Sequence, residues 1–109
     1  MATIEDFQKL DIRVGRIIDV KDFPEAKKPS YKLRIDFGRF GIKRSSAQIT
    51  HLYSKEDLKG KQIIAVTNFP PKKIAGFNSE VLVLGAITKY NKVVLLKPER
   101  EAELGDKIA

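Results

Sequence analysis

The chain has 109 residues, a formal net charge of +7, 32% charged residues and no cysteine. A chain of this length with no change of composition along it predicts one domain, residues 1–109, with a single core. The lack of cysteine excludes disulfides and thiolate metal sites, no apolar run reaches the roughly 20 residues that span a bilayer, and no signal peptide precedes the first element, so we expect a cytoplasmic protein.

The positive charge is concentrated in the middle of the chain. Residues 26–79 hold twelve Lys and Arg against three Asp and Glu, whereas residues 1–25 are slightly acidic and residues 80–109 are balanced. A one-sided basic field favours phosphate backbones or acidic partners.

A short helix and a long strand are expected first. Thr3 and Asp6 have the spacing of a helix cap. The stretch DIRVGRIIDVKDF then alternates apolar and polar residues, and a bulge at Gly15 would restore its register, with Ile18 and Val20 facing the core beyond it. Such a long, bent first strand is typical of a small closed barrel.

The clearest strand of the sequence is YKLRIDF. Its core face is expected to carry Tyr31, Leu33, Ile35 and Phe37, while polar residues alternate with them. The glycines of GRFG then predict a turn. The stretch IKRSSAQI is predicted to be a surface strand, because its polar residues outnumber its apolar ones.

The second half of the chain predicts one helix and three short strands. Ser54 and Asp57 form a second capping pattern, which indicates a short helix that ends at Gly60. IIAVT, EVLVLGAIT and KVVLL follow as apolar strands, with a hairpin turn at Asn91. The charged tail, PEREAELGDKI, either frays or packs back onto the domain.

This order of elements predicts an all-β fold. We expect a five-stranded, partly open antiparallel barrel of the oligonucleotide/oligosaccharide-binding (OB) type, with a short N-terminal helix and one short helix between strands three and four. A small β-sandwich is the structural alternative, and the helix between strands three and four distinguishes the two.

The stretch NFPPKKIAGFNSEVLVL is the most distinctive part of the sequence. Pro70 and Pro71 cannot donate to a strand ladder, so the preceding strand is expected to end before them. Lys72 and Lys73 would then leave a stiff loop together, an arrangement suited to a polyanion. The alternative is a loop that the prolines shape and the lysines keep soluble.

No catalytic or metal-binding arrangement is found. His51, the only histidine, lies at the head of a predicted helix, where a capping or partly buried role is expected. Ser45 and Ser46 lack the strand-turn-helix context of a nucleophile, and GRFG is not a phosphate-binding loop. We therefore predict no catalytic residue, no metal, no cofactor and no enzyme activity.

Four stretches, DIRVGRI, YKLRIDFG, HLYSKEDLKGK and NFPPKKIAGFNSEVLVLG, resemble the tRNA-binding domain family, which includes the C-terminal domain of methionyl-tRNA synthetases. Within the family, KPSYKLRIDFG and IKRSSAQIT are most similar to the CsaA-type bacterial export chaperones. The resemblance implies a homodimer that binds unfolded precursor proteins for the Sec export machinery and has tRNA-binding capacity. A tRNA-binding accessory protein without a chaperone role is the alternative.

The family motif also suggests binding residues. Asn68, Pro71, Lys73 and Ser79 match it, whereas Ala75 stands in place of an arginine and removes a planar multi-donor group. Combined with the basic strand positions, the predicted tRNA- or polyanion-binding residues are Lys32, Arg34, Lys43, Arg44, Asn68, Lys72, Lys73 and Ser79.

Three phenylalanines near the basic strands, Phe40, Phe69 and Phe77, are the predicted peptide-binding residues, unless they fill the core instead. The two termini carry apolar residues that short exposed ends do not need, with Ile4 and Phe7 at one end and Ile108 at the other. A twofold contact between copies through the termini is therefore expected.

Overall fold

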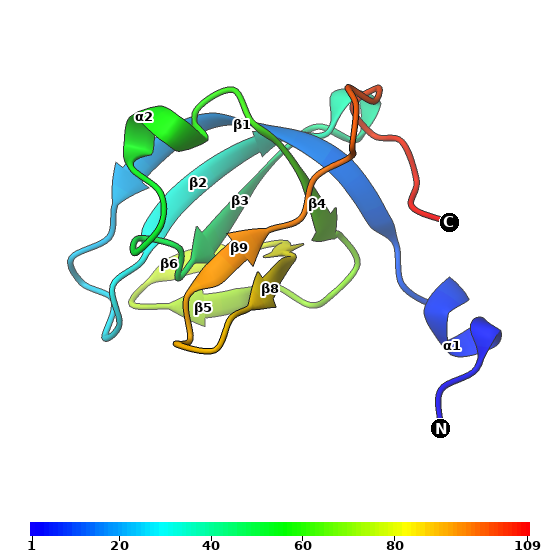
Figure 1. Ribbon diagram of the computed structural model, residues 1–109, viewed down its shortest axis with the longest axis horizontal. Coiled ribbons are helices and arrows are strands. Elements are labelled where there is room, and N and C mark those ends of the chain that lie inside the picture. Colours follow the sequence, from blue (N-terminus) through cyan, green and yellow to red (C-terminus); the bar gives the residue numbers. More distant parts are fainter.

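The computed structural model describes residues 1–109 and has the predicted all-β architecture, an OB-type barrel. Five antiparallel strands in the order β3-β2-β1-β4-β7 curve into a nearly closed barrel (Figure 1). The barrel strands are β1 (Ile12–Asp22), β2 (Tyr31–Asp36), β3 (Ile42–Ala47), β4 (Gln62–Val66) and β7 (Leu82–Val83). The helices are α1 (Ile4–Gln8), α2 (Lys55–Leu58) and a 3₁₀ turn, Gly38–Phe40, and none has the length and apolar composition that crossing a membrane requires.

The bulge in β1 lies elsewhere than predicted. The register with β2 shifts between Ile17 and Asp19, so the prediction of a bulge at Gly15 is wrong. Gly15 is required for a different reason, because a Cβ there would lie 2.6 Å from Ile35 in the packed interior. The shift lets Ile17 and Val20, rather than Ile18 and Val20, pack against the core.

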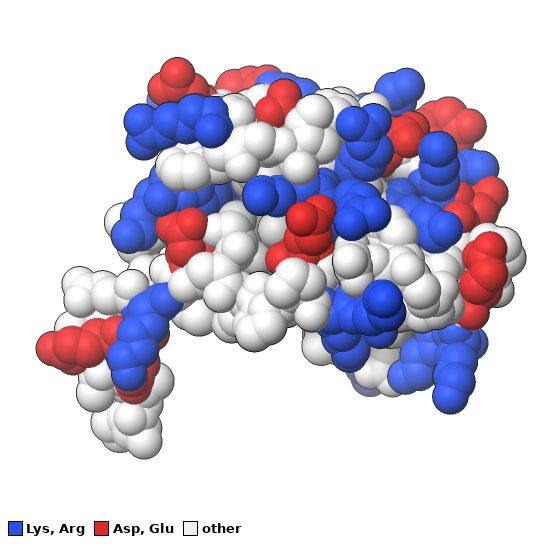
Figure 2. Space-filling view, turned by 180° about the vertical axis from the view of Figure 1, so that it is seen from behind, with Lys and Arg blue, Asp and Glu red and all other residues white.

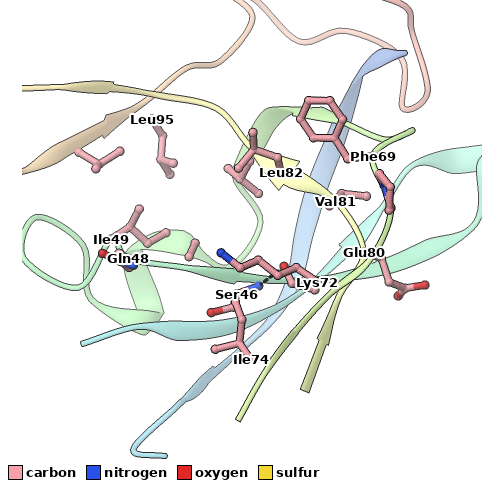
Figure 3. Close-up of a pocket in the computed structure, with 15 residues that line it drawn as sticks. Ser46, Gln48, Ile49, Phe69, Lys72, Ile74, Glu80, Val81, Leu82 and Leu95 are labelled. Carbon is pink, nitrogen blue, oxygen red and sulfur yellow. Dashed lines mark hydrogen bonds between the residues drawn. The ribbon is translucent and has the colours of Figure 1, made fainter. Parts of the chain in front are cut away.

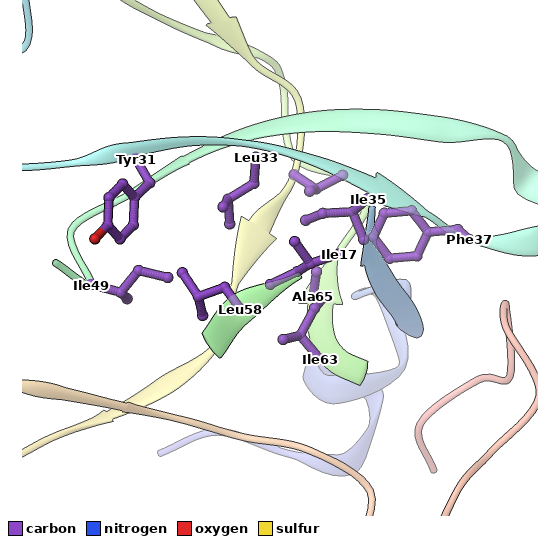
Figure 4. Packing of buried hydrophobic residues seen from close by; sticks show 10 residues of the cluster. Ile17, Tyr31, Leu33, Ile35, Phe37, Ile49, Leu58, Ile63 and Ala65 are labelled. Carbon is purple, nitrogen blue, oxygen red and sulfur yellow. The ribbon is translucent and has the colours of Figure 1, made fainter. Parts of the chain in front are cut away.

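The core is built around β2, as its alternation predicts (Figure 4). The cluster consists of Ile17, Tyr31, Leu33, Ile35, Phe37, Ile49, Leu58, Ile63, Ala65 and Val81. Leu58 reaches it from α2, between β3 and β4, where Ser54 and Asp57 form the predicted capping box. This helix supports the barrel and argues against the sandwich.

Two small hairpins stand beside the barrel and were only partly predicted. The first joins β5 (Lys72–Ile74) to β6 (Phe77–Ser79), and the second joins β8 (Gly85–Ile87) to β9 (Val93–Leu95). Asn91 has a φ of 60° in the second turn, as a hairpin there requires. The stretch EVLVLGAIT does not form one strand, because it is divided between β7 and β8.

The C-terminal tail packs back along β1. Gly105 donates its N–H to the Val14 carbonyl at 2.8 Å, and Ile108 donates to the Ile12 carbonyl at 2.9 Å. The Gln62 side chain also bonds both backbone groups of Ala102, at 2.6 and 3.0 Å. The tail thus covers the part of the β1 edge that β2 leaves open.

The N-terminal arm, residues 1–10, projects from the barrel, whereas the C-terminal tail packs against it. The predicted capping box between Thr3 and Asp6 is present, but no residue of α1 is buried. The helix extends away from the barrel, at the lower right of Figure 1.

Candidate functional site

A pocket of about 460 Å³ lies between the two hairpins, above the end of β3 (Figure 3). Its lining is mainly apolar and comes from segments far apart in the sequence. These residues include Ile49 after β3, Phe69 and Pro70 after β4, Ile74 in β5, Val81 and Leu82 around β7, and Leu95 in β9. An open apolar pocket of this size suits side chains of another molecule.

Lys72 supplies the pocket with an unpaired positive charge. The two charged residues of the lining are Lys72 and Glu80. The Glu80 carboxylate accepts hydrogen bonds from the backbone N–H and the Nε of Arg44, at 2.9 and 3.4 Å. No carboxylate lies within 4 Å of the Lys72 ammonium. An apolar pocket beside an unpaired ammonium suits a ligand that carries an acidic group next to an apolar one.

The three predicted peptide-binding phenylalanines do not lie together. Phe69 lines the pocket and is 42% exposed. Phe40 is 38% exposed, with the Arg13 guanidinium carbon 4.0 Å from its ring centroid, and it does not line the pocket. Phe77 packs edge to face against Phe23, with 5.5 Å between ring centroids. Of the three, Phe69 alone is placed to contact a ligand in the pocket.

Three predicted polyanion-binding residues share the outer face of β2 and β3. Arg34 and Arg44 are directly opposed across the two strands, and both are exposed. Lys32 lies on the same face of β2, since residues two apart on a strand point the same way. Its ammonium lies 4.7 Å from the Phe23 ring centroid and 5.4 Å from that of Phe77, so two rings fix its position.

The pair of opposed arginines is electrostatically unfavourable by itself. Like charges directly opposite each other on neighbouring strands destabilise a sheet. Asp19 opposes Arg34 from β1, and Glu80 pairs with Arg44. Figure 2 shows that Lys and Arg are widespread over the back of the molecule, with fewer carboxylates between them. A bound anion would relieve the remaining repulsion.

Strand geometry separates the members of two pairs of basic residues that are adjacent in sequence. Lys72 lines the pocket, whereas Lys73, the next residue of β5, faces the opposite side of the hairpin. Lys43 pairs with Ile35 and Arg44 with Arg34, so these two also lie on opposite faces of β3. The lysines of the PPKK motif therefore do not emerge together.

The remaining two predicted residues have hydrogen bonds within the chain. Ser79 accepts a hydrogen bond from the Ser46 N–H at 3.0 Å, which helps to close the barrel beside β3. Asn68 accepts from the Asp11 N–H through Oδ1 and donates to the Lys9 carbonyl through Nδ2, both at 2.8 Å.

Asp11, which donates its N–H to Asn68, also carries a charged side chain with partners of its own. The Thr67 hydroxyl donates to its Oδ2 at 2.6 Å, and Arg13 lies 3.0 Å from Oδ1. The Thr67 hydrogen bond, with Arg13 beside it, lowers the pKa of the Asp11 carboxyl from its ordinary value of 3.8. Asp11 therefore stays ionised wherever the protein is folded near neutral pH.

Several residues of both surfaces are not among the binding residues that the sequence predicts. Phe23 was expected only as the end of a strand, yet it is the ring beneath Lys32. Gln48, Leu82 and Leu95 line the pocket and lie on three different segments. The exposure of Leu82, 49%, marks it as a contact residue in the structure, but the sequence shows only one more apolar residue of a predicted strand. No group of three His, Asp or Glu side chains is arranged to hold a metal ion.

Comparison with known proteins adds independent information. A family described as "Putative tRNA binding domain" matches residues 12–107. The structure is similar to the CsaA chaperone protein from Picrophilus torridus, with a TM-score of 0.95 and 62% identity over 100% of both chains. It is also similar to the chaperone CsaA from Bacillus anthracis, with a TM-score of 0.96 and 54% identity over 100% of this chain and 99% of that one.

Longer proteins contain a related segment. The methionine–tRNA ligase of Pyrococcus horikoshii is 42% identical over 104 residues, which are 95% of this chain and 14% of the ligase. The chain thus spans about a seventh of the length of these curated relatives.

Proposed function

Because this chain belongs to the tRNA-binding domain family and is a CsaA-type member of it, we propose that it is a cytoplasmic chaperone that binds unfolded precursor proteins for Sec-dependent export. It also has a capacity to bind tRNA. Both activities are binding functions, and neither requires a cofactor.

The observation that carries the chaperone function is the pocket beside Lys72. Unfolded chains expose apolar side chains, and the apolar lining around Phe69 and Leu82 offers them a place out of water. Burying one Leu, Val or Phe side chain contributes roughly 1.5–3 kcal/mol. Lys72 adds a preference for segments with an acidic residue beside the apolar one. Weak, repeated contacts of this kind suit a chaperone, which must release what it binds.

The basic outer face supports the tRNA capacity. Arg34 and Arg44 have the fork of donors that matches a phosphate, and Lys32 is held beside them. Lys43, Lys73, Asn68 and Ser79 remain separate candidates for tRNA contacts, because Lys43 lies on the opposite face of β3 from Arg44 and the side chains of Asn68 and Ser79 have hydrogen bonds within the chain. Without the arginine that the family carries at position 75, backbone contacts should dominate, so we expect general rather than tRNA-specific affinity.

The proposed active form is a homodimer. Large apolar side chains that are at least 40% exposed occur both on the arm and around the second hairpin, and they include Ile4, Leu82, Ile87, Val94 and Leu96. Exposed apolar area of this extent marks interaction sites. A second copy of the chain would cover it.

Binding measurements at two salt concentrations test this function. A fluorescent unfolded precursor segment is titrated with the protein at low and moderate salt. Saturable binding whose affinity changes little with salt supports the chaperone function, because a mainly apolar site releases few counterions. No peptide binding, together with tight tRNA binding that falls steeply with salt, would refute it.

That second outcome would establish the alternative, a tRNA-binding accessory protein without a chaperone role. The opposed arginines favour this alternative, since they create an anion site that a peptide pocket does not need. Each phosphate contact contributes roughly −0.7 to −0.9 to the slope of log affinity against log salt concentration. The measured slope divided by this value therefore gives the number of phosphate contacts.

A further inference from the structure

The first hairpin leaves one edge of a strand without a partner. β5 pairs with β6 in a two-stranded sheet, and no strand pairs with its other edge. The turn of this hairpin consists of Ala75 and Gly76, whose φ values are 46° and 82°. Two successive residues with positive φ form a tight turn of type I′, which fixes the register of the hairpin. An unpaired strand edge is a place where an extended chain can add as a further strand.

The register of the hairpin shows which backbone groups this edge offers. Next to a two-residue turn, the flanking residues Ile74 and Phe77 form a hydrogen-bonded pair, so the following pair, Lys73 and Asn78, exchanges no hydrogen bonds. The N–H and C=O of Lys73 therefore point away from β6. Residues 71–75 form no backbone hydrogen bond outside the strand ladder. Lys73 thus presents one free donor and one free acceptor at the edge.

The same strand lines the pocket. Successive side chains of a strand point to opposite faces, and Lys72 and Ile74 line the pocket while Lys73, between them, does not. A strand added beside β5 would continue this alternation, so every second side chain of the added strand would lie on the pocket side. There it would meet the apolar lining and the Lys72 ammonium.

We propose that an extended segment of a precursor protein binds as an added strand on β5, with backbone hydrogen bonds to Lys73 and alternate side chains in the pocket. The inference rests on the proposed chaperone function and specifies how its ligand lies. Backbone groups are the same in every unfolded chain, so these hydrogen bonds do not depend on sequence. The pocket and Lys72 then add the preference for apolar and acidic residues.

Charge identifies the occupant of this edge. The β5 strand of a second copy would bring Lys72 and Lys73 beside the same two lysines, and like charges on neighbouring strands destabilise a sheet. Pro71, directly before β5, has no N–H with which to extend a ladder. A short segment with an acidic residue neutralises Lys72 instead and needs only the free groups of Lys73.

Two substitutions at one position isolate the backbone donor. Lys73→Ala and Lys73→Pro both remove the ammonium, and Lys73→Pro also removes the N–H. Because this N–H points away from β6, proline leaves the hydrogen bonds of the hairpin in place, and an edge strand tolerates it. Fluorescence anisotropy with a labelled unfolded precursor segment measures both affinities. The dissociation constant of Lys73→Pro should be roughly fivefold to tenfold that of Lys73→Ala.

A scan of the peptide tests the same contact with the wild-type protein. A single backbone N-methyl group is moved along the peptide one residue at a time. Methylation of the residue whose N–H faces Lys73 should weaken binding roughly tenfold, because it removes a donor and places a methyl group against the strand. Methylation of either neighbour should weaken binding by less than about twofold, since those N–H groups point away from β5.

The outcomes separate the added strand from the proposed function. Equal affinities of Lys73→Pro and Lys73→Ala, or a methyl scan without this alternation, would overturn the added strand while the pocket remains a peptide site. If Lys73→Pro fails to fold, the methyl scan decides alone. A wild-type protein that does not bind the unmethylated peptide would overturn the proposed chaperone function itself.

Discussion

Two adjacent lysines give the sharpest test of how ligands bind. Lys72 lines the pocket and Lys73 faces the other side of β5, so the same substitution at each should affect different ligands. We choose Lys72→Met and Lys73→Met, because methionine keeps most of the apolar stem and removes the ammonium. Each variant is the control for the other in net charge and in place along the chain.

The expected magnitudes follow from the surroundings of each ammonium. The Lys72 side chain is exposed, and an exposed ion pair contributes roughly 0.2–1 kcal/mol, so Lys72→Met should weaken a peptide with an acidic residue by up to about fivefold. The same peptide with a neutral amide in place of the acid should bind both proteins equally. Lys73→Met should leave the peptide unaffected and reduce the salt slope of tRNA binding by roughly 0.7–0.9, the value of one phosphate contact.

Fluorescence anisotropy with labelled peptide and labelled tRNA measures both quantities. If either variant lowered the affinities for peptide and for tRNA to the same extent, the two ligands would share one site. The placement of Lys72 and Lys73 on opposite sides of β5 would then not separate their functions. If Lys72→Met weakened the amide peptide as strongly as the acidic one, the lysine would act through its stem and not through its charge.

Three further predictions concern the fold. Gly15→Ala places a Cβ 2.6 Å from a core side chain, so it should lower the free energy of unfolding in urea by roughly 1–3 kcal/mol, and an unchanged midpoint would contradict the packing. Since the Thr67 hydroxyl lowers the pKa of Asp11, its ionised form stabilises the folded state above about pH 4 and this contribution disappears as the pH falls through the lower folded value. The stability advantage of wild type over Asp11→Asn should therefore shrink only in acid, and a constant advantage down to pH 2 would refute the assignment. Gln62→Ala leaves both backbone groups of Ala102 unpaired, so proteolysis of the tail should accelerate several-fold, whereas an unchanged cleavage rate would show that β1 alone holds the tail.

The parts of the fold that the sequence predicts well are those where one local pattern decides the outcome. The alternation of β2 is unambiguous because one face must enter the barrel, and Tyr31 and Phe37 are both in the core. The capping boxes at Thr3 and Ser54 depend only on residues three positions apart. Such features need no knowledge of the rest of the chain.

The features that were mispredicted depend on pairing between distant segments. The bulge in β1 is set by the register with β2, and the glycine that suggested another position serves close packing instead. Asn68 matches a family motif, but the motif does not reveal that its partners are Lys9 and Asp11. The pocket is equally invisible in the sequence, since hairpins and strand ends meet there only in three dimensions.

Glu80 connects the two surfaces that this fold presents. It lines the pocket, and its carboxylate accepts two hydrogen bonds from Arg44 on the basic face. A phosphate that binds Arg44 must compete with Glu80, and a released carboxylate beside the pocket would repel an acidic peptide near Lys72. We therefore expect saturating tRNA to weaken peptide binding without abolishing it, and Glu80→Gln to remove this effect in the anisotropy assay. Complete displacement of the peptide by tRNA, in wild type and in Glu80→Gln alike, would mean that the ligands collide directly and that Glu80 does not couple them.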